Sequence, residues 1–202
     1  MDWQQFETLA RDYLKQHLGH AVPGELRRER MFDEQPLEGE GRTALLSCLL
    51  SMPSAILARG VQPRPNFYVA VGETEPGLFP TYDLGVDDAY SLHVGTRFMV
   101  GMRAARLEPS DEPPDARAAL RSFVRECVPE ARIEAEELAV LFGVDERFFA
   151  VYRLTINGEP VYCVGADCPP GFYRMTQHPP QIALRLHLGK LIRNEARLER
   201  QL

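Results

Sequence analysis

Long hydrophobic runs are absent from this sequence. The chain of 202 residues has no apolar stretch near the roughly 20 residues that a membrane-spanning helix requires. Its start, Met1 to Gln5, has no basic segment followed by an apolar one, so we expect no signal peptide. These two absences predict a cytoplasmic protein that has no membrane partner.

Lysine is also scarce, and acidic residues outnumber basic ones by 29 to 23. Lys15 and Lys190 are the only lysines, and the formal net charge is -6. The arginines are dispersed among acidic residues rather than gathered into a basic patch. Because nucleic acids attract basic surfaces, we expect no nucleic-acid partner.

Cysteine is infrequent, with residues at 48, 127, 163 and 168. Without a secretion signal, free thiols in a reducing compartment are expected. Cys48 and Cys127 follow apolar stretches, and both are predicted to be small buried residues.

The chain does contain a pair of similar segments. Residues 71–79 read VGETEPGLF and residues 164–173 read VGADCPPGFY, while LHVG at 92–95 matches LHLG at 186–189. The offset is 93 at the first glycine and 94 at the histidine and the second glycine, which indicates one inserted residue in the Pro-Gly loop. Matches in the same order at a nearly constant offset predict an internal duplication. The alternative is that two similar strand–loop–helix joints arose independently.

Each half is predicted to begin with an amphipathic helix. Asp2 is expected to cap a helix whose apolar residues recur at helical spacing as far as Leu18, and Asp115 is expected to open the corresponding helix before Pro129. Three antiparallel strands should follow in each half. The expected strands are 26–33, 43–50 and 66–72, then 138–142, 148–156 and 160–164.

Turns and closing helices complete each half. Asn157-Gly158 predicts a type I′ hairpin turn, because both positions need positive φ. A longer proline-rich segment, 52–65, takes its place in the first half. The closing helices are expected from Asp87-Asp88 to about Ala105, and from Pro179-Pro180 nearly to the end of the chain.

The predicted fold class is therefore α+β, with two tandem α-β-β-β-α repeats related by a pseudo-twofold axis. The predicted domains are a first repeat at 1–107, an acidic proline-rich linker at 108–115 and a second repeat at 116–202. This order of elements resembles that of secretion-chaperone folds, a likeness of fold that says little about function.

Glycine and histidine stand at equivalent places in the two closing helices. Gly95 and Gly189 each weaken a helix by about 1 kcal/mol relative to alanine, so a close helix crossing is expected there. His93 and His187 lie beside them, either as structural, hydrogen-bonded histidines or as a symmetric pair that binds a metal or senses pH. The structural interpretation is favoured.

The two Pro-Gly-aromatic loops are the candidate binding surface. Each places bulky apolar residues directly after a turn, with an arginine nearby, which is typical of interface anchors. The candidate binding residues are Leu78, Phe79, Arg97, Phe172, Tyr173 and Arg174. In the alternative interpretation, these side chains turn inward and close the end of each sheet.

A cysteine and histidine cluster near the end of the chain is the alternative site. Cys163 and Cys168 have C-x4-C spacing, and His178 and His187 follow. These four residues could bind zinc, but the usual tight C-x2-C pairs are missing. Cys168 could be a nucleophile only if an imidazole lay within hydrogen-bond distance and the thiol pKa were lowered.

No phosphate-binding loop or recognised catalytic motif occurs, so the sequence predicts no catalytic residue and no cofactor. The leading hypothesis is a non-catalytic adaptor or chaperone-like protein that binds another protein or self-associates. The alternative is a small hydrolase or metal-dependent enzyme that uses the cysteine and histidine cluster.

Overall fold

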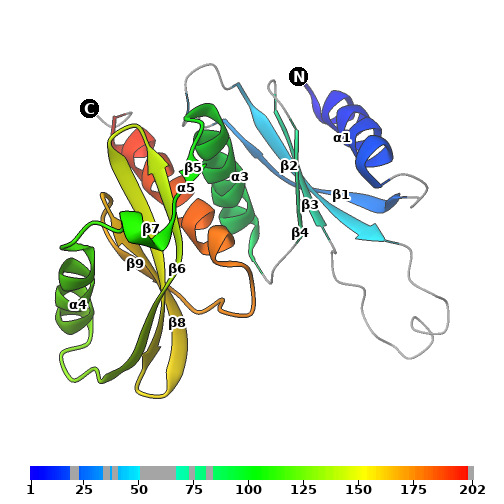
Figure 1. The fold of residues 1–202 in the computed structure, drawn as a ribbon. Helices are drawn as coiled ribbons and strands as arrows, with labels where there is room; N and C mark the ends of the chain where they lie inside the picture. The colour runs from blue at the N-terminus through cyan, green and yellow to red at the C-terminus, as the bar shows by residue number, and fades with distance from the viewer. Residues whose placement is uncertain are drawn as a thin grey trace, which may run out of the picture. The chain divides into compact units, whose positions relative to one another are not determined.

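The computed structural model describes residues 1–18, 23–33, 37, 41–50, 67–72, 76–80 and 84–199. In these residues the fold is α+β, with four α-helices and two antiparallel sheets (Figure 1). The chain divides into unit 1, Met1–Val94 with Lys190–Leu202, and unit 2, Gly95–Gly189. The domain limits at 107 and 116 stay a prediction, and the proline-rich segment 52–65 lies outside the described residues.

Unit 1 contains a four-stranded sheet with the order β1-β2-β3-β4. The strands are β1 (Pro23–Phe32), β2 (Thr43–Leu50), β3 (Phe67–Gly72) and β4 (Gly77–Pro80). The first three agree with the expected strands to within three residues. The fourth was expected as a loop, and it is instead an edge strand that pairs with β3.

Helix α1 (Trp3–Leu18) packs its apolar stripe on this sheet. As predicted, Asp2 caps it: the Asp2 carboxylate accepts from the Gln5 amide, and the Gln5 side chain accepts from the Asp2 amide. Phe6, Ala10 and Leu14 recur every four residues and are fully buried. They join the sheet residues Ala44, Leu46, Cys48, Val69 and Val71 in one core.

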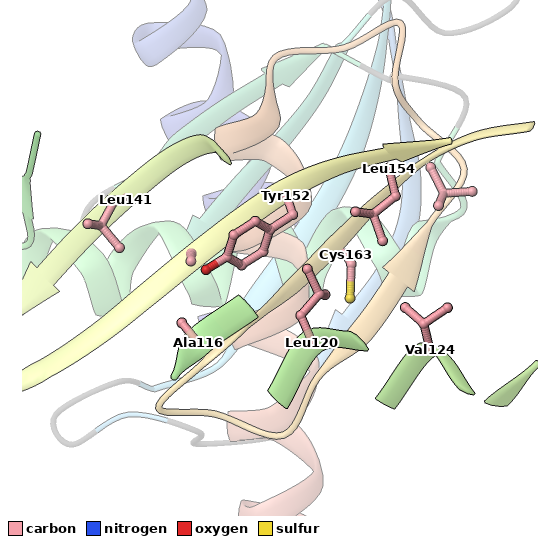
Figure 2. Close-up of a cluster of buried hydrophobic side chains, with 9 residues drawn as sticks. Ala116, Leu120, Val124, Leu141, Tyr152, Leu154 and Cys163 are labelled. Atoms are coloured by element: carbon pink, nitrogen blue, oxygen red, sulfur yellow. The ribbon is translucent and has the colours of Figure 1, made fainter. Parts of the chain in front are cut away.

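Unit 2 contains a five-stranded sheet with the order β5-β6-β7-β8-β9. Its strands are β5 (Ala105–Arg106), β6 (Ile133–Val144), β7 (Arg147–Ile156), β8 (Glu159–Ala166) and β9 (Gly171–Tyr173). Helix α4 (Ala116–Cys127) packs Ala116, Leu120 and Val124 on this sheet. Figure 2 shows these side chains facing Tyr152, Leu154 and Cys163.

The turn between β7 and β8 confirms one prediction in detail. Asn157 has φ 52° and Gly158 has φ 83°, so both central residues of the hairpin are left-handed. The Asn157 side chain also accepts a hydrogen bond from the Arg132 amide at 2.9 Å. This bond holds the turn against the segment that leads into β6.

Helices α3 (Val86–Gly101) and α5 (Pro180–Glu199) each contribute residues to both units. In unit 2, a Cβ added to Gly95 would lie 1.8 Å from the Arg185 carbonyl oxygen and 2.9 Å from the Gly189 nitrogen. The two helices therefore touch backbone to backbone at the glycines, which is the close approach that the sequence predicted.

In unit 1, a buried arginine joins the same two helices. Arg193 on α5 is 4% exposed, and it donates to the Asp87 carbonyl oxygen at 2.8 Å and to the Ser91 hydroxyl at 2.7 Å. Its guanidinium also stacks over the rings of Tyr90 and Phe32. These contacts fix the last part of α5 in unit 1.

Two local expectations were wrong. Cys127 is exposed, since it is the last residue of α4 and lies beyond the part of the helix that covers the sheet. Helix α3 ends at Gly101 rather than near Ala105, because residues 105 and 106 pair with β6. The expectation that Asp115 opens α4 is confirmed, since Asp115 is its N-cap residue, although the side chain makes no capping bond.

A search of the described helices finds none that is both long and apolar enough to cross a membrane.

Candidate functional site

The aromatic residues proposed as binding anchors lie on the edge strands β4 and β9, not on loops. Leu78 and Phe79 belong to β4 in unit 1, while Phe172 and Tyr173 belong to β9 in unit 2. Leu78 packs against the unit 1 core, and Phe172 packs against the unit 2 core. The Phe172 ring also stacks on Phe123 of α4 at 4.9 Å. Their side chains thus turn largely inward.

Phe79 on β4 and Tyr173 on β9 each contact a histidine of the same unit. Phe79 is 9% exposed and meets His93 edge to face, with ring centroids 5.8 Å apart. Tyr173 meets His187 in the same manner at 5.7 Å. Both histidines are buried. The structural interpretation of the two histidines therefore describes their packing well.

The two arginines of the candidate set are in unit 2 and differ in exposure. Arg174 is exposed at the end of β9, and Arg97 on α3 is half-buried. The six candidate residues are thus divided between the units, Leu78 and Phe79 in unit 1 and the other four in unit 2. Their role in binding stays a prediction.

The thiols of the alternative site are buried in unit 2. Burial, as the main cause, raises the pKa of Cys163 to about 12 and that of Cys168 to about 11. The nearby Arg147 lowers the pKa of Cys168 by less than burial raises it. Both thiols are therefore protonated at neutral pH, which makes them poor nucleophiles.

One of the two histidines of the alternative site, His187, is engaged at both ring nitrogens. His187 Nε2 lies 2.7 Å from the Pro169 carbonyl oxygen, to which it donates. His187 Nδ1 then accepts from the Tyr173 hydroxyl at 2.9 Å. A metal would have to displace one of these bonds. Among the described residues, no group of three or more histidine, cysteine or acidic side chains could hold a metal ion.

Two hollows on unit 2 escaped the sequence analysis, and both lie along β6. The first, about 440 Å³, is lined by Arg121 and Arg125 of α4, by Ala131 and by residues 133–136 of β6. The second, about 290 Å³, is lined by residues 106–109 and by residues 138–141 of β6. One strand therefore forms a wall of both hollows.

Each hollow coincides with an irregularity in β6. The pairing of β6 with β7 shifts register between Ile133 and Ala135, and again between Leu138 and Val140. Glu134 and Ala139 are therefore extra residues without a directly opposite partner, as in a β-bulge. Bulges bend a strand and re-aim its side chains, which accounts for the two separate hollows.

The outer edge of β6 is open over most of its length. On the side away from β7, β5 pairs only with Phe142 and Gly143, and the Leu107 amide donates to the Leu141 carbonyl oxygen at 3.0 Å. Within the described part of the chain, no strand pairs with this edge between Ile133 and Val140. The edge therefore offers backbone hydrogen-bonding groups to a partner.

An ion-pair network fixes the wall of the first hollow. Glu136, whose side chain is 8% exposed, accepts from Arg121 Nε at 2.8 Å and from Arg117 Nη1 at 3.3 Å. Arg117 also donates to Glu112, which accepts from the Tyr152 hydroxyl at 2.8 Å. Burial, followed by this bond to Glu112, raises the pKa of Tyr152. The network holds α4 against β6.

Comparison of the chain with protein-family models finds no match, and comparisons with curated proteins and with solved structures find none either.

Proposed function

We propose that the chain is a non-catalytic protein-binding module, of the adaptor or chaperone-like kind, built from two copies of one structural unit. The observation that carries the proposal is that β6 lines both hollows of unit 2, and that no strand in the described part of the chain pairs with its outer edge between Ile133 and Val140. Such an edge can bind an extended polypeptide through its backbone. The proposed partner is another protein.

The strand pairings support the duplication. In unit 1, Tyr68 pairs with Phe79 and Ala70 pairs with Gly77. In unit 2, residues 162 and 164 pair with 173 and 171 in the same way, so every equivalent residue is 94 positions further along. The hydrogen bond from Tyr68 to the carbonyl oxygen of residue 84 also has its counterpart, from Tyr162 to that of residue 178. Two units that arose independently would have no reason to share this constant offset of 94.

The first half of each unit supports the same conclusion. A register shift occurs at Glu29 in β1 and at Ala139 in β6, 110 positions apart. The buried faces of α1 and α4 keep that offset, since residues 6, 10 and 14 correspond to 116, 120 and 124. A bulge retained at the same place argues for a shared ancestor.

These equivalences refine the proposed repeat. The repeat has four strands, β1–β4 in the first copy and β6–β9 in the second, of which β4 and β9 are the short last strands. A uniform offset of 94 across β3 and β4 makes the inserted residue in the Pro-Gly loop unnecessary. The pseudo-twofold relation between the copies stays part of the proposal.

The alternative, an enzyme that uses Cys163, Cys168, His178 and His187, has less support. Its thiols have raised pKa values, and His187 donates and accepts within the fold. Catalysis by a cysteine needs the opposite shift.

A pull-down with the purified protein, followed by chemical cross-linking and mass spectrometry, tests the proposal. One dominant protein partner, cross-linked to unit 2 and displaced by excess untagged protein, is the expected result. Metal analysis and thiol-reactivity measurement are made on the same sample. Stoichiometric metal without any partner would overturn the proposal and favour the enzyme.

Two substitutions each test one of the six candidate binding residues. Phe79→Ser is expected to lower stability, because Phe79 is buried against His93. Arg174→Ala changes an exposed residue, so its fold should be intact. If the Arg174→Ala variant is folded but no longer binds the partner in the pull-down, the surface around Arg174 takes part in binding.

A further inference from the structure

The outer edge of β6 in unit 2 has a defined length and a hollow at each end. The eight residues 133–140 span about 25 Å at the usual rise per residue of a strand. The first hollow includes the bulged residue Glu134, and the second includes the bulged residue Ala139. An extended segment of about eight residues lying along this edge would reach both hollows.

The two hollows differ in chemistry. The second is lined largely by apolar residues, among them Leu107, Pro109, Leu138 and Leu141. It suits one bulky apolar side chain of a bound segment. The first is lined by arginines from α4 and by glutamates from β6. It suits a charged side chain.

The charges on β6 favour a basic segment. The strand IEAEELAVLFGV contains three glutamates, Glu134, Glu136 and Glu137, and no basic residue. Arg117 and Arg121 hold Glu136, and Glu137 pairs across the ladder with Arg153. Glu134 is exposed and makes no ion pair with any described residue. A lysine or arginine on the added strand would meet it directly, and opposite charges across a ladder are stabilising.

The same charges disfavour a second copy of this chain as the occupant. If two β6 edges paired, the glutamates of one would face those of the other, and like charges directly opposite are destabilising. Arg125 of α4 also lines the first hollow, but it lies on the helix wall rather than on the strand edge. An acidic segment could reach Arg125 only while running beside the glutamates.

From this juxtaposition we propose that the edge of β6 between its two bulges binds an extended basic segment of a partner protein by strand addition, with one apolar residue of that segment in the hollow beside Leu107. The inference rests on the proposed protein-binding function and names its site. The edge supplies backbone hydrogen bonds, and the hollows supply selectivity.

The test uses three synthetic probes and fluorescence anisotropy at low salt. The first is a ten-residue peptide that alternates lysine and valine, the second replaces lysine with glutamate, and the third is the lysine peptide with alternate backbone nitrogens methylated. We expect the lysine peptide to bind, with at least tenfold weaker binding of the other two. Hydrogen exchange should then slow in residues 133–140.

A matched pair of variants separates strand addition from general attraction. Glu134→Lys reverses the charge at the edge. It should weaken binding of the lysine peptide at least tenfold and strengthen binding of the glutamate peptide. Glu130→Lys makes the same charge change at an exposed residue before β6, and should alter affinity less than threefold. Circular dichroism checks that both variants are folded.

Several outcomes would overturn the inference. Equal binding of the methylated peptide would show that no backbone pairing occurs. An equal loss of affinity for the lysine peptide in the Glu134→Lys and Glu130→Lys variants would show that only the net charge matters. Stronger binding of the glutamate peptide than of the lysine peptide would show that Arg125 decides the selectivity. If the Glu134→Lys variant still captured the partner found by pull-down, this site would be wrong while the protein-binding function remained.

Discussion

Replacement of Gly95 by alanine tests the helix contact that both copies of the LHxG motif serve. The added Cβ would lie 1.8 Å from the Arg185 carbonyl oxygen, where contacts under 3.0 Å are essentially never tolerated. The backbones must therefore separate by at least about 1.2 Å. Because the obstacle is backbone, no side-chain rotation relieves it. Overpacking of this kind costs about 1–3 kcal/mol.

The intrinsic helix preference of alanine acts in the opposite direction. Alanine is favoured over glycine within a helix by about 1 kcal/mol. If overpacking costs about 3 kcal/mol, the upper end of its range, the free energy of unfolding falls by a net amount of about 2 kcal/mol. For a chain of this size, that loss lowers Tm by roughly 4–8 °C. Thermal unfolding followed by circular dichroism measures it.

Gly101→Ala is the matched control in the same helix. Apart from the backbone of its own helix, no heavy atom of the described residues lies within 4 Å of the position that its Cβ would take, so its Tm should stay equal or rise slightly. If Gly95→Ala were as stable as this control, the reasoning about the helix contact would be refuted.

Three further predictions concern unit 2. Of the four cysteines only Cys127 is exposed, so native protein should react with one equivalent of a thiol reagent at neutral pH, and fast reaction of Cys168 would contradict its raised pKa. Tyr152→Phe should lose about 1 kcal/mol at neutral pH, because its bond to Glu112 disappears. Since folding raises the pKa of Tyr152 above its ordinary value of 10.0, the stability that it contributes is complete below about pH 10 and is lost at higher pH. Denaturant titrations should therefore show a flatter alkaline profile in the variant, and an identical profile would contradict the shift. Gly158→Ala should cost about 1–2 kcal/mol, because φ is 83° there, and an unchanged urea midpoint would argue against the type I′ turn.

Elements with local signals could be predicted from the sequence. The helices at 3–18 and 116–127 follow from apolar residues at helical spacing, and the hairpin at 157–158 follows from the conformational needs of its turn. The close approach at Gly95 followed from a glycine that appeared in both copies of a motif. For the helices and the hairpin, the residues that decide the structure are neighbours in the chain, whereas at Gly95 the signal was the recurrence of the motif.

Elements decided by tertiary pairing could not be predicted. Residues 77–80 and 171–173 contain turn formers, yet each pairs with the strand before it because that strand presents an open edge. The bulges at Glu134 and Ala139 depend on the pairing with β7, and no residue at these positions signals them. The hollows that line the candidate site result from those bulges, so the sequence contained no sign of the site.

The exchange of helix ends between the units has a consequence for the order in which the chain can fold during synthesis. Unit 2 is one continuous segment, 95–189, and all of its partners are available once that segment has left the ribosome. In unit 1, the contacts of Arg193 with Asp87 and Ser91 span more than 100 residues of sequence. The buried core of α1 and the N-terminal sheet lies within residues 6–71, whereas the start of α3 gains its contacts with Arg193 only once the end of α5 has been made. Unit 1 is therefore completed last, in contrast to the usual order of domain folding from the N-terminus.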